Sequence, residues 1–381
     1  MTHQSQDTAI EDDAKVVSND IAVAGQWSLV WRKFKKHKLA MIGAYVVGLF
    51  YLIAIFAEFL APQLPNAYNA RYTFAPPQTL SFIRQTDDGI RIQPHVYGYT
   101  AEVNPDSGRR TFSIDEDEII PVGFFVKGAN YRMWGLFTWN RHIIGPKESG
   151  APMHLLGTDH LGRDVFSRTI YGTRVSMTIG LVGVSLSLIL GVILGGISGY
   201  FGGWVDNVVQ RTIEFLQSIP SIPLWMGLAA AIPQQVSPLM VYFLITVILS
   251  VLGWTGLARV VRGKFYALKT EDFVIAAQVD GVSNYRVISR HMVPSFLSHI
   301  IATVTLAVPS MIIAETALSF LGLGLRAPVV SWGVLLQQAQ SVRVVADAPW
   351  LLMPGLAVVV VVLGFNFLGD GMRDAADPYA S

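Results

Sequence analysis

The amino-acid sequence predicts an all-α polytopic membrane protein with six transmembrane helices and a small β-containing insert outside the membrane. Apolar residues make up 52% of the 381 residues and charged residues only 14%, so a soluble fold of this length would leave much apolar surface in water. Six apolar segments are long enough to cross a hydrocarbon core of about 30 Å. One long polar segment separates the first of them from the other five.

The composition also excludes several classes of function. The net charge of +1 gives no sign of a nucleic-acid partner. The sequence contains no cysteine, which excludes disulfides, cysteine-ligated zinc, iron–sulfur clusters and thiol catalysis.

The chain is expected to divide into five regions. Residues 1–31 form a polar cytoplasmic tail, and residues 32–61 form a basic flank and the first span, at 39–60. Residues 62–156 form the outer insert. The core at 157–369 precedes a short cytoplasmic tail at 370–381. Its five spans are expected at 175–197, 215–232, 239–257, 300–325 and 349–368.

The positions of lysine and arginine predict the orientation. Six spans place both termini on the same side of the membrane. With the termini in the cytoplasm, 14 of the 28 basic residues lie in inner segments and only two, Arg326 and Arg343, in short outer loops. The remaining 12 lie in the long segment 62–174, which the positive-inside rule does not count. The rule therefore favours cytoplasmic N- and C-termini.

The outer insert has the pattern of antiparallel strands. Residues 104–108, with the sequence NPDSG, form a turn signal between 96–103 and 110–114. Both flanks are rich in aromatic and β-branched residues, so a hairpin is expected there. A further strand is expected at 124–126, followed by a turn at Lys127-Gly128.

Small residues recur every fourth position along the second span. This spacing places them on one helix face, where small side chains let membrane helices approach closely. Close helix packing is expected, with a flexible gate as the alternative, at Gly183, Ser187, Gly191, Gly195 and Gly199.

The same helix contains residues 196–199, GISG, which match the short G-x-S-G signature of rhomboid-type intramembrane proteases. A serine nucleophile needs a base within hydrogen-bond reach. No expected span carries a histidine inside the membrane, and His291 and His299 lie in or beside an inner loop. A hydrolase built on Ser198 is therefore an outside alternative.

Glu315 is the only ionisable residue well inside an expected span, and Asn366 is a weaker polar example. Such residues are costly in hydrocarbon and usually face a cavity or a partner group. Two interpretations stay open. Either these residues line a substrate path, or Glu315 makes a structural hydrogen bond to another helix.

Residues 156–164 lie just before the second span and contain two acids and a histidine, Asp159, Asp164 and His160. These residue types can hold a metal ion. The glycines and capping residues of the segment fit a turn into an interfacial helix better. No metal site is therefore expected.

The inner loop at 259–297 is too long for a simple connection and carries six basic residues. A short amphipathic helix is expected at 273–279, with a break at Asp280-Gly281. A second helix is expected at 282–292, ending before Pro294. This order suggests a rigid docking elbow, and a plain solvated loop is the alternative.

The spacing within this loop also carries a resemblance. Ala276-Ala277 is followed by Gly281 and then by Pro294, thirteen residues further on. This spacing resembles the "EAA" loop of binding-protein-dependent ABC importer permeases. Three positions depart from the family pattern: isoleucine replaces glutamate at 275, histidine replaces isoleucine at 291, and valine replaces leucine at 293.

Further motifs resemble the dipeptide/oligopeptide permeases of the "C" subunit type. They are LGTD and GRD within 156–164, GYFGG at 199–203 with Asp206, SFLGLG at 319–324, and GDGMRD at 369–374 with Asp377-Pro378. The resemblance covers about residues 30–61 and 155–379. The segment 62–154 is longer than in ordinary dipeptide permeases. It is more like extended subtypes, some of which look like oligosaccharide importers.

The resemblance implies one transmembrane subunit of a type I ABC importer in a bacterial inner membrane. Such a subunit moves di- or oligopeptides by alternating access, and oligosaccharides are the alternative cargo. The implied partners are a second homologous permease, two ATP-binding subunits and a periplasmic solute-binding protein. The inner loop would contact the ATP-binding subunits through Ala276, Ala277, Asp280, Gly281 and Pro294.

The resemblance also implies a transport subunit rather than an enzyme. The sequence has no G-x-x-x-x-G-K-[ST] loop to hold ATP phosphates, so ATP and Mg are expected on the partner subunits and no cofactor on this chain. A proton- or ion-coupled carrier is the remaining rival. A single buried acid and the lack of an inverted repeat argue against it.

Overall fold

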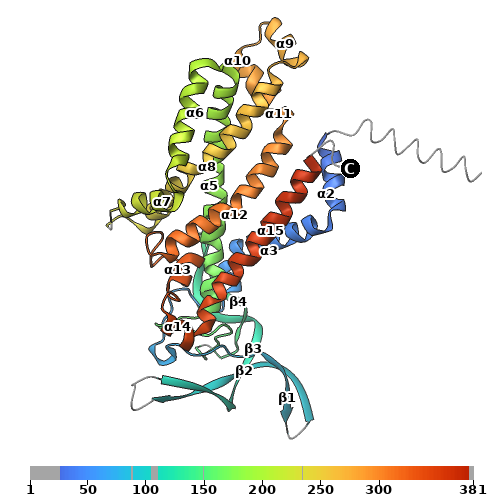
Figure 1. Cartoon of the computed structure of the whole chain (residues 1–381). Coiled ribbons are helices and arrows are strands. Elements are labelled where there is room, and N and C mark those ends of the chain that lie inside the picture. The colour runs from blue at the N-terminus through green and yellow to red at the C-terminus, as the bar shows by residue number, and fades with distance from the viewer. Residues whose placement is uncertain (1–25, 87–88, 104–109, 149, 234, 377–381) are drawn as a thin grey trace, which may run out of the picture.

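The computed structural model describes residues 26–86, 89–103, 110–148, 150–233 and 235–376. Figure 1 shows long helices side by side, with a β-sheet at one end and the short helices α9 and α10 at the other. The predicted class, a helical membrane protein with a small sheet, is therefore confirmed.

Five helices in the described part of the chain are long and apolar enough to cross a membrane. Each matches one of the expected spans. They are α3 (Lys38–Ile55), α5 (Val165–Phe201), α8 (Pro238–Leu268), α12 (Leu297–Phe320) and α15 (Met353–Ala376).

The span expected at 215–232 is instead divided between two shorter helices, α6 (Gly203–Ser218) and α7 (Ser221–Ala230). Ile219, between them, has extended backbone with φ −91° and ψ 128°. The ring of Pro220 explains this break, because a proline disfavours helical backbone in the residue before it. This apolar segment is therefore two helices joined at a proline.

The outer insert folds as an antiparallel sheet in the order β1-β2-β3-β4. Its strands are β1 (Ser81–Thr86), β2 (Gly89–Val103), β3 (Arg110–Met133) and β4 (Phe137–Pro146). The expected hairpin is confirmed, since β2 pairs with β3 up to Val103 opposite Arg110. The turn residues 104–108 lie outside the described residues.

The turn expected at Lys127-Gly128 is wrong. Strand β3 continues through these residues to Met133, and the chain reverses at Trp134 and Gly135, which both have positive φ. The pairing of β3 with β4 shifts register between Lys127 and Tyr131, as in a β-bulge. The glycine serves this close approach, because a Cβ at Gly128 would lie 2.5 Å from the ring of His142.

The transmembrane helices share one main core where α5, α8 and α12 meet α13 (Trp332–Gln337). Ile312 and Trp332 lie at its centre with no exposed surface. The five small residues spaced four apart between Gly183 and Gly199 on α5 are all buried. Added Cβ atoms would lie 2.9 Å from Leu257 at Gly191 and 2.7 Å from Phe265 at Gly199, so these positions allow α8 to pack closely.

Short elements connect the bundle to the sheet and to the chain ends. They are α2 (Gln26–Lys36), α4 (Ala57–Leu60), η1 (Ala70–Tyr72), α14 (Val342–Asp347) and η3 (Pro349–Leu352). In Figure 1, α2 (blue) lies beside the C-terminal end of α15 (red), on the side away from the sheet.

Candidate docking site

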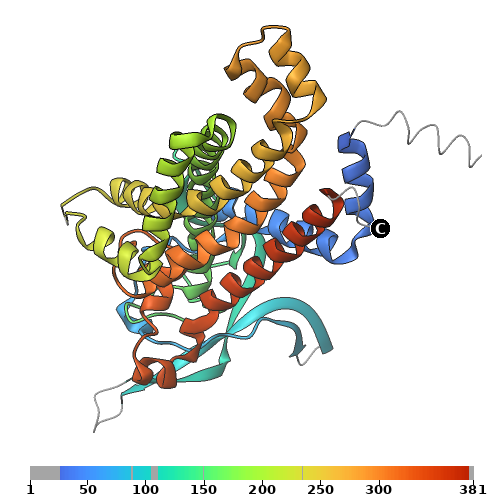
Figure 2. The same ribbon diagram turned by 45° about the horizontal axis from the view of Figure 1, so that its top comes forward.

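The end of the molecule opposite the sheet carries a helical hairpin that we call the docking element (residues 269–296). It consists of α9 (Asp272–Val279), α10 (Asn284–Arg286), the π-helical turn η2 (Val287–Met292) and α11 (Val293–Ser295). In Figure 2 it (orange) projects beyond the neighbouring helices. The element begins later than the expected loop at 259–297, because α8 stays helical to Leu268.

The first half of the docking element has the expected local structure. The helix expected at 273–279 is present as α9, and it ends at Asp280-Gly281. Gly281 has a φ of 72°, a left-handed conformation that glycine adopts without steric cost. The N–H of Val282 donates to the Ala277 carbonyl oxygen at 3.0 Å, which closes the helix end and turns the chain back.

The second half differs from the prediction at Pro294. Helical backbone continues through this residue to Ser295 and is interrupted only at Phe296, where φ is −123° and ψ is 21°. Pro294 lies in the first turn of α11, where the missing N–H leaves few hydrogen bonds unmade. The helical segment expected to end before Pro294 therefore extends one residue beyond it.

The docking element has a small core of its own. It packs against Phe265 of α8, and its buried side chains are Val274, Ala277, Val287, Met292 and Phe296. The five residues that the resemblance assigns to the ATPase contact therefore fall into two groups, one buried and one exposed. Ala277 faces this core and is 7% exposed. The others lie at the surface: Ala276, Asp280, Gly281 and Pro294.

Apolar side chains also lie on the outward face of the docking element. Val279 and Tyr285 are each 81% exposed, and Phe273 is 42% exposed. The sequence does not single out these residues, because their exposure is evident only once Val274 and Ala277 are known to face inward. Exposed apolar side chains clustered on one projecting element are typical of an interaction site.

Tyr200, at the C-terminal end of α5, fixes the docking element to the bundle. Its hydroxyl donates to Asn284 Oδ1 at 2.7 Å and accepts from Gln278 Nε2 at 3.2 Å. Its backbone carbonyl oxygen accepts from Lys269 Nζ at 2.9 Å. Both arms of the hairpin are thus hydrogen-bonded to one residue of α5.

A second polar cluster joins α5, α6 and α8 near Tyr200. Arg262 donates to Asp206 twice, with Nε–Oδ1 and Nη2–Oδ2 distances of 2.6 Å, and Tyr266 donates to Asp206 at 2.9 Å. The hydrogen bonds from Arg262 hold the pKa of the Asp206 carboxyl well below its usual range. Asp206 is therefore a permanent anion that links the α5–α6 turn to α8.

Ser198 belongs to this cluster. Its hydroxyl donates to Asp206 and accepts from Gln210 Nε2 at 3.3 Å. Asp206 is a poor proton acceptor because its pKa is lowered. These surroundings favour a structural role for Ser198 and give no support to the hydrolase alternative.

Glu315 lies in the interior at the junction of α12, α5 and α13, with no exposed surface. Its Oε1 accepts from Ser319 and Ser331, both at 2.8 Å, and its Oε2 lies 3.4 Å from Ser176 Oγ. This geometry supports the interhelical hydrogen-bond interpretation. Asn366 is half-buried on α15.

The segment at 156–164 forms a turn held by charge pairs. Asp159 accepts from Arg163 Nε at 2.8 Å and also from Arg168, and Asp164 caps α5 by accepting from Ser167 N at 2.7 Å. Among the described residues, no group of three His, Cys, Asp or Glu side chains is placed to hold a metal ion. The carboxylates of this turn are used for helix capping and ion pairing.

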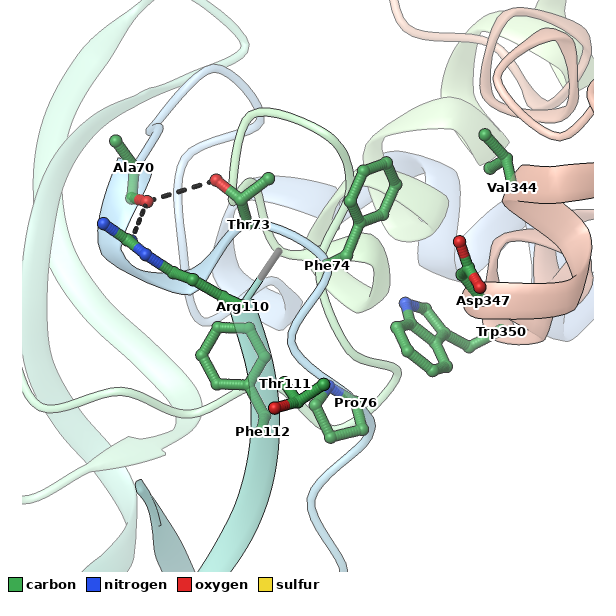
Figure 3. Close-up of a pocket in the computed structure, with 10 residues that line it drawn as sticks. All are labelled: Ala70, Thr73, Phe74, Pro76, Arg110, Thr111, Phe112, Val344, Asp347 and Trp350. Atoms are coloured by element: carbon green, nitrogen blue, oxygen red, sulfur yellow. Dashed lines mark hydrogen bonds between the residues drawn. The ribbon is translucent and has the colours of Figure 1, made fainter. Parts of the chain in front are cut away.

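A cavity of about 750 Å³ opens at the sheet end of the molecule, between β3 and α14 (Figure 3). Aromatic rings form much of its wall, from Phe74, Phe112 and Trp350. Arg110 lies at its edge, where its guanidinium donates to the Ala70 carbonyl oxygen at 2.7 Å. The cavity joins the sheet to the outer ends of the membrane helices.

Comparison with known proteins identifies the family. Residues 189–380 match the family described as "Binding-protein-dependent transport system inner membrane component". Residues 25–77, which include α2 and α3, match "N-terminal TM domain of oligopeptide transport permease C".

Similar curated proteins cover most of the chain. The dipeptide transport system permease protein DppC of Bacillus subtilis is 30% identical over 91% of this chain and 84% of its own length. DppC of Alkalihalophilus pseudofirmus is 32% identical over 92% and 90%. The oligopeptide transport system permease protein OppC of Haemophilus influenzae is 39% identical over 63% and 74%.

Among solved structures, a chain of the inward-facing MetNI methionine ABC transporter matches 56% of this chain and 97% of its own, with 16% identity and a TM-score of 0.43. That similarity is too distant to carry a conclusion. The family match spans half of the chain and the DppC relatives more than nine tenths of it. The chain therefore belongs to the family of binding-protein-dependent transport system inner membrane components.

Proposed function

We propose that this chain is one of two permease subunits in an ATP-driven importer, and that it couples movements of ATP-binding partners to alternating access of a central path. The observation that carries this proposal is the docking element. It projects from the bundle, exposes Val279 and Tyr285, and is tied to α5 through Tyr200. A rigid element that is uncovered on one side and anchored on the other is suited to transmit force.

The proposed cargo is a di- or oligopeptide. The support comes from the relatives, which are named dipeptide and oligopeptide transport system permease proteins. Import of oligosaccharides by the same machinery is the second candidate. It was suggested by the length of segment 62–154, which adds a complete four-stranded sheet to the permease core.

In this proposal, two ATP-binding subunits bind ATP and Mg, and a solute-binding protein outside the membrane first binds the cargo. The docking end then faces the cytoplasm together with both chain termini, and the sheet faces outward. Two features support this orientation. The basic residues favour it, and α2 and the end of α15 lie on the side away from the sheet. The outer cavity beside Trp350 lies on the side where a binding protein would arrive.

The test is capture of partners by the full chain. An affinity-tagged chain expressed in its native host should co-purify with ATP-binding subunits. The double variant Val279→Asp, Tyr285→Asp should lose most of them, because two charges would have to be buried in the contact. The matched control is Ile92→Asp, which alters an 84% exposed residue of the outer sheet and should leave capture unchanged.

Equal capture by the double variant and the control, at equal membrane levels, would contradict the assigned contact face. Loss of uptake in Ser198→Ala together with preserved uptake in the double variant would favour the hydrolase alternative. A mass-spectrometric identification of the molecule held by the co-purified solute-binding protein separates peptide from oligosaccharide.

A further inference from the structure

A basic corner lies where α2 leads into the first membrane helix. α2 ends at Lys36 and α3 begins at Lys38, so α2 has to lie at the membrane surface. Five cations in this stretch have exposed side chains: Arg32, Lys33, Lys35, Lys36 and Lys38.

The corner is held in place by one buried aromatic side chain. Phe34 is 2% exposed and packs with Ala40 of α3 and Ala375 of α15. Trp31 stacks on Phe34 with a centroid distance of 5.5 Å, yet it remains 53% exposed. Lys35 Nζ lies 5.3 Å from the centroid of the Trp31 ring. An exposed tryptophan beside a cation is typical of the headgroup region of a bilayer.

Positive charges on α2 lie close enough to repel one another. Arg32 and Lys36 are four residues apart, so they share the helix face opposite Phe34, and like charges at this spacing repel each other. The exposed acids on the adjacent end of α15 are Asp370 and Asp374, and Asp374 lies 3.7 Å from His37. A bound anion between Arg32 and Lys36 would relieve the repulsion between these two cations.

We propose that Arg32, Lys35 and Lys36 bind the phosphate of an anionic phospholipid in the leaflet on the docking side, with Trp31 at the boundary between headgroups and acyl chains. The position of α2 next to a membrane helix favours a lipid over a soluble phosphate, since only a lipid brings apolar surface to the exposed indole. This proposal is independent of cargo and of the ATP-binding partners.

The experiment is native mass spectrometry of the full chain released from nanodiscs that contain both phosphatidylglycerol and phosphatidylcholine. The wild-type chain should retain phosphatidylglycerol in preference to phosphatidylcholine. The triple variant Arg32→Gln, Lys35→Gln, Lys36→Gln should bind phosphatidylglycerol about 100-fold more weakly, at about fivefold for each cation removed.

The matched control removes three exposed cations of the outer sheet region, Lys127→Gln, Arg132→Gln and Lys147→Gln, and should retain the lipid. The charge-preserving variant Arg32→Lys, Lys35→Arg, Lys36→Arg should also retain it, which guards against loss by misfolding. Equal retention of both lipids by the wild-type chain would overturn the proposal. So would equal affinity in the triple variant and the control, or displacement of the lipid by glycerol 3-phosphate at matched concentration.

Discussion

The two ends of this molecule are attached to the membrane helices in different ways. At the docking end, short helices rest on a small core and on the hydroxyl of Tyr200, and they leave Val279 and Tyr285 uncovered. At the outer end, a four-stranded sheet is joined to the membrane helices by several bonds. Trp134 Nε1 donates to the Ile55 carbonyl oxygen at 2.7 Å, and His142 Nδ1 donates to that of Ala61 at 2.6 Å.

The two ends differ in how they are attached to the membrane helices. The outer end also contains an ion pair between Glu58 and Arg174, in which the carboxylate accepts from Nη1 at 2.6 Å. Phe59 stacks on Trp139 at 5.8 Å, so the sheet is attached through apolar as well as polar contacts. The docking end is held more locally. Exposed apolar side chains occur at both ends, for example Val279 at the docking end and Ile92 on the sheet. We expect substitutions at the docking end to impair the coupling of uptake to ATP hydrolysis. Changes at the sheet end should impair the encounter with the solute-binding protein.

The largest expected effect is that of Gly281→Val. Its φ of 72° is strained for a β-branched residue by about 1–2 kcal/mol, and a Cβ there meets no atom within 4 Å, so the effect comes from the backbone alone. Uptake by the assembled transporter should fall at least about tenfold while the chain still inserts. Gly281→Asn is the matched control, because asparagine tolerates this conformation, and it should keep most of the uptake. Normal uptake in the valine variant would mean that the hairpin is only a connection.

Removing the sheet tests the other side of the comparison. A chain in which a Gly/Ser linker replaces residues 81–146 should still co-purify with ATP-binding subunits, because the docking end is unchanged. Stimulation of ATP hydrolysis by the binding protein should fall several-fold, while basal hydrolysis remains. Unchanged stimulation would show that the sheet does not contribute to the encounter.

A smaller effect is expected for Tyr200→Phe, which keeps the ring and removes the hydroxyl. The loss of the bonds to Asn284 and Gln278 should cost about 0.5–1.5 kcal/mol each, so the hairpin would move partly independently of α5. The number of cargo molecules moved per ATP should fall several-fold with little change in basal ATP hydrolysis. Tyr45→Phe, at a 71% exposed position on α3, is the control. An unchanged number of cargo molecules per ATP would mean that the hairpin is connected to the bundle mainly through other residues, for example Asp206.

Sequence patterns predicted the membrane helices better than they predicted the docking surface. Continuous apolar runs have one strong physical cause, so five of the six expected spans match long apolar helices of the described chain. Pro220 could also have marked the broken helix at 215–232, but an apolar run hides a backbone break from any count of hydropathy. Pro294 was expected to end a helix, but the helical backbone passes through it to Ser295.

The residues around the docking element show why its surface and its hydrogen bonds could not be predicted from the sequence. Ala276 and Ala277 are adjacent and chemically identical, yet one is exposed and the other buried. Tyr200 lies 84 positions from Asn284 in the chain, and nothing local in the sequence indicates that they share a hydrogen bond. Such pairings arise from how helices pack, which periodicity within one segment does not contain.

Glu315 lies between the two ends, in the middle of the bundle. Its variants show whether a buried polar residue there serves stability or transport. In the hydrogen-bond interpretation, Glu315→Gln keeps an acceptor for Ser319 and Ser331, so stability and uptake should change little. Glu315→Leu would leave buried hydroxyls unpaired, at about 1–3 kcal/mol for each, and should lower the thermal unfolding temperature of the purified chain by several degrees. Unfolding followed by tryptophan fluorescence measures this, with Ser185→Ala on an exposed part of α5 as the control. If Glu315 instead contacts cargo, the glutamine variant should change the cargo preference at unchanged stability, because the charge would then matter more than the acceptor.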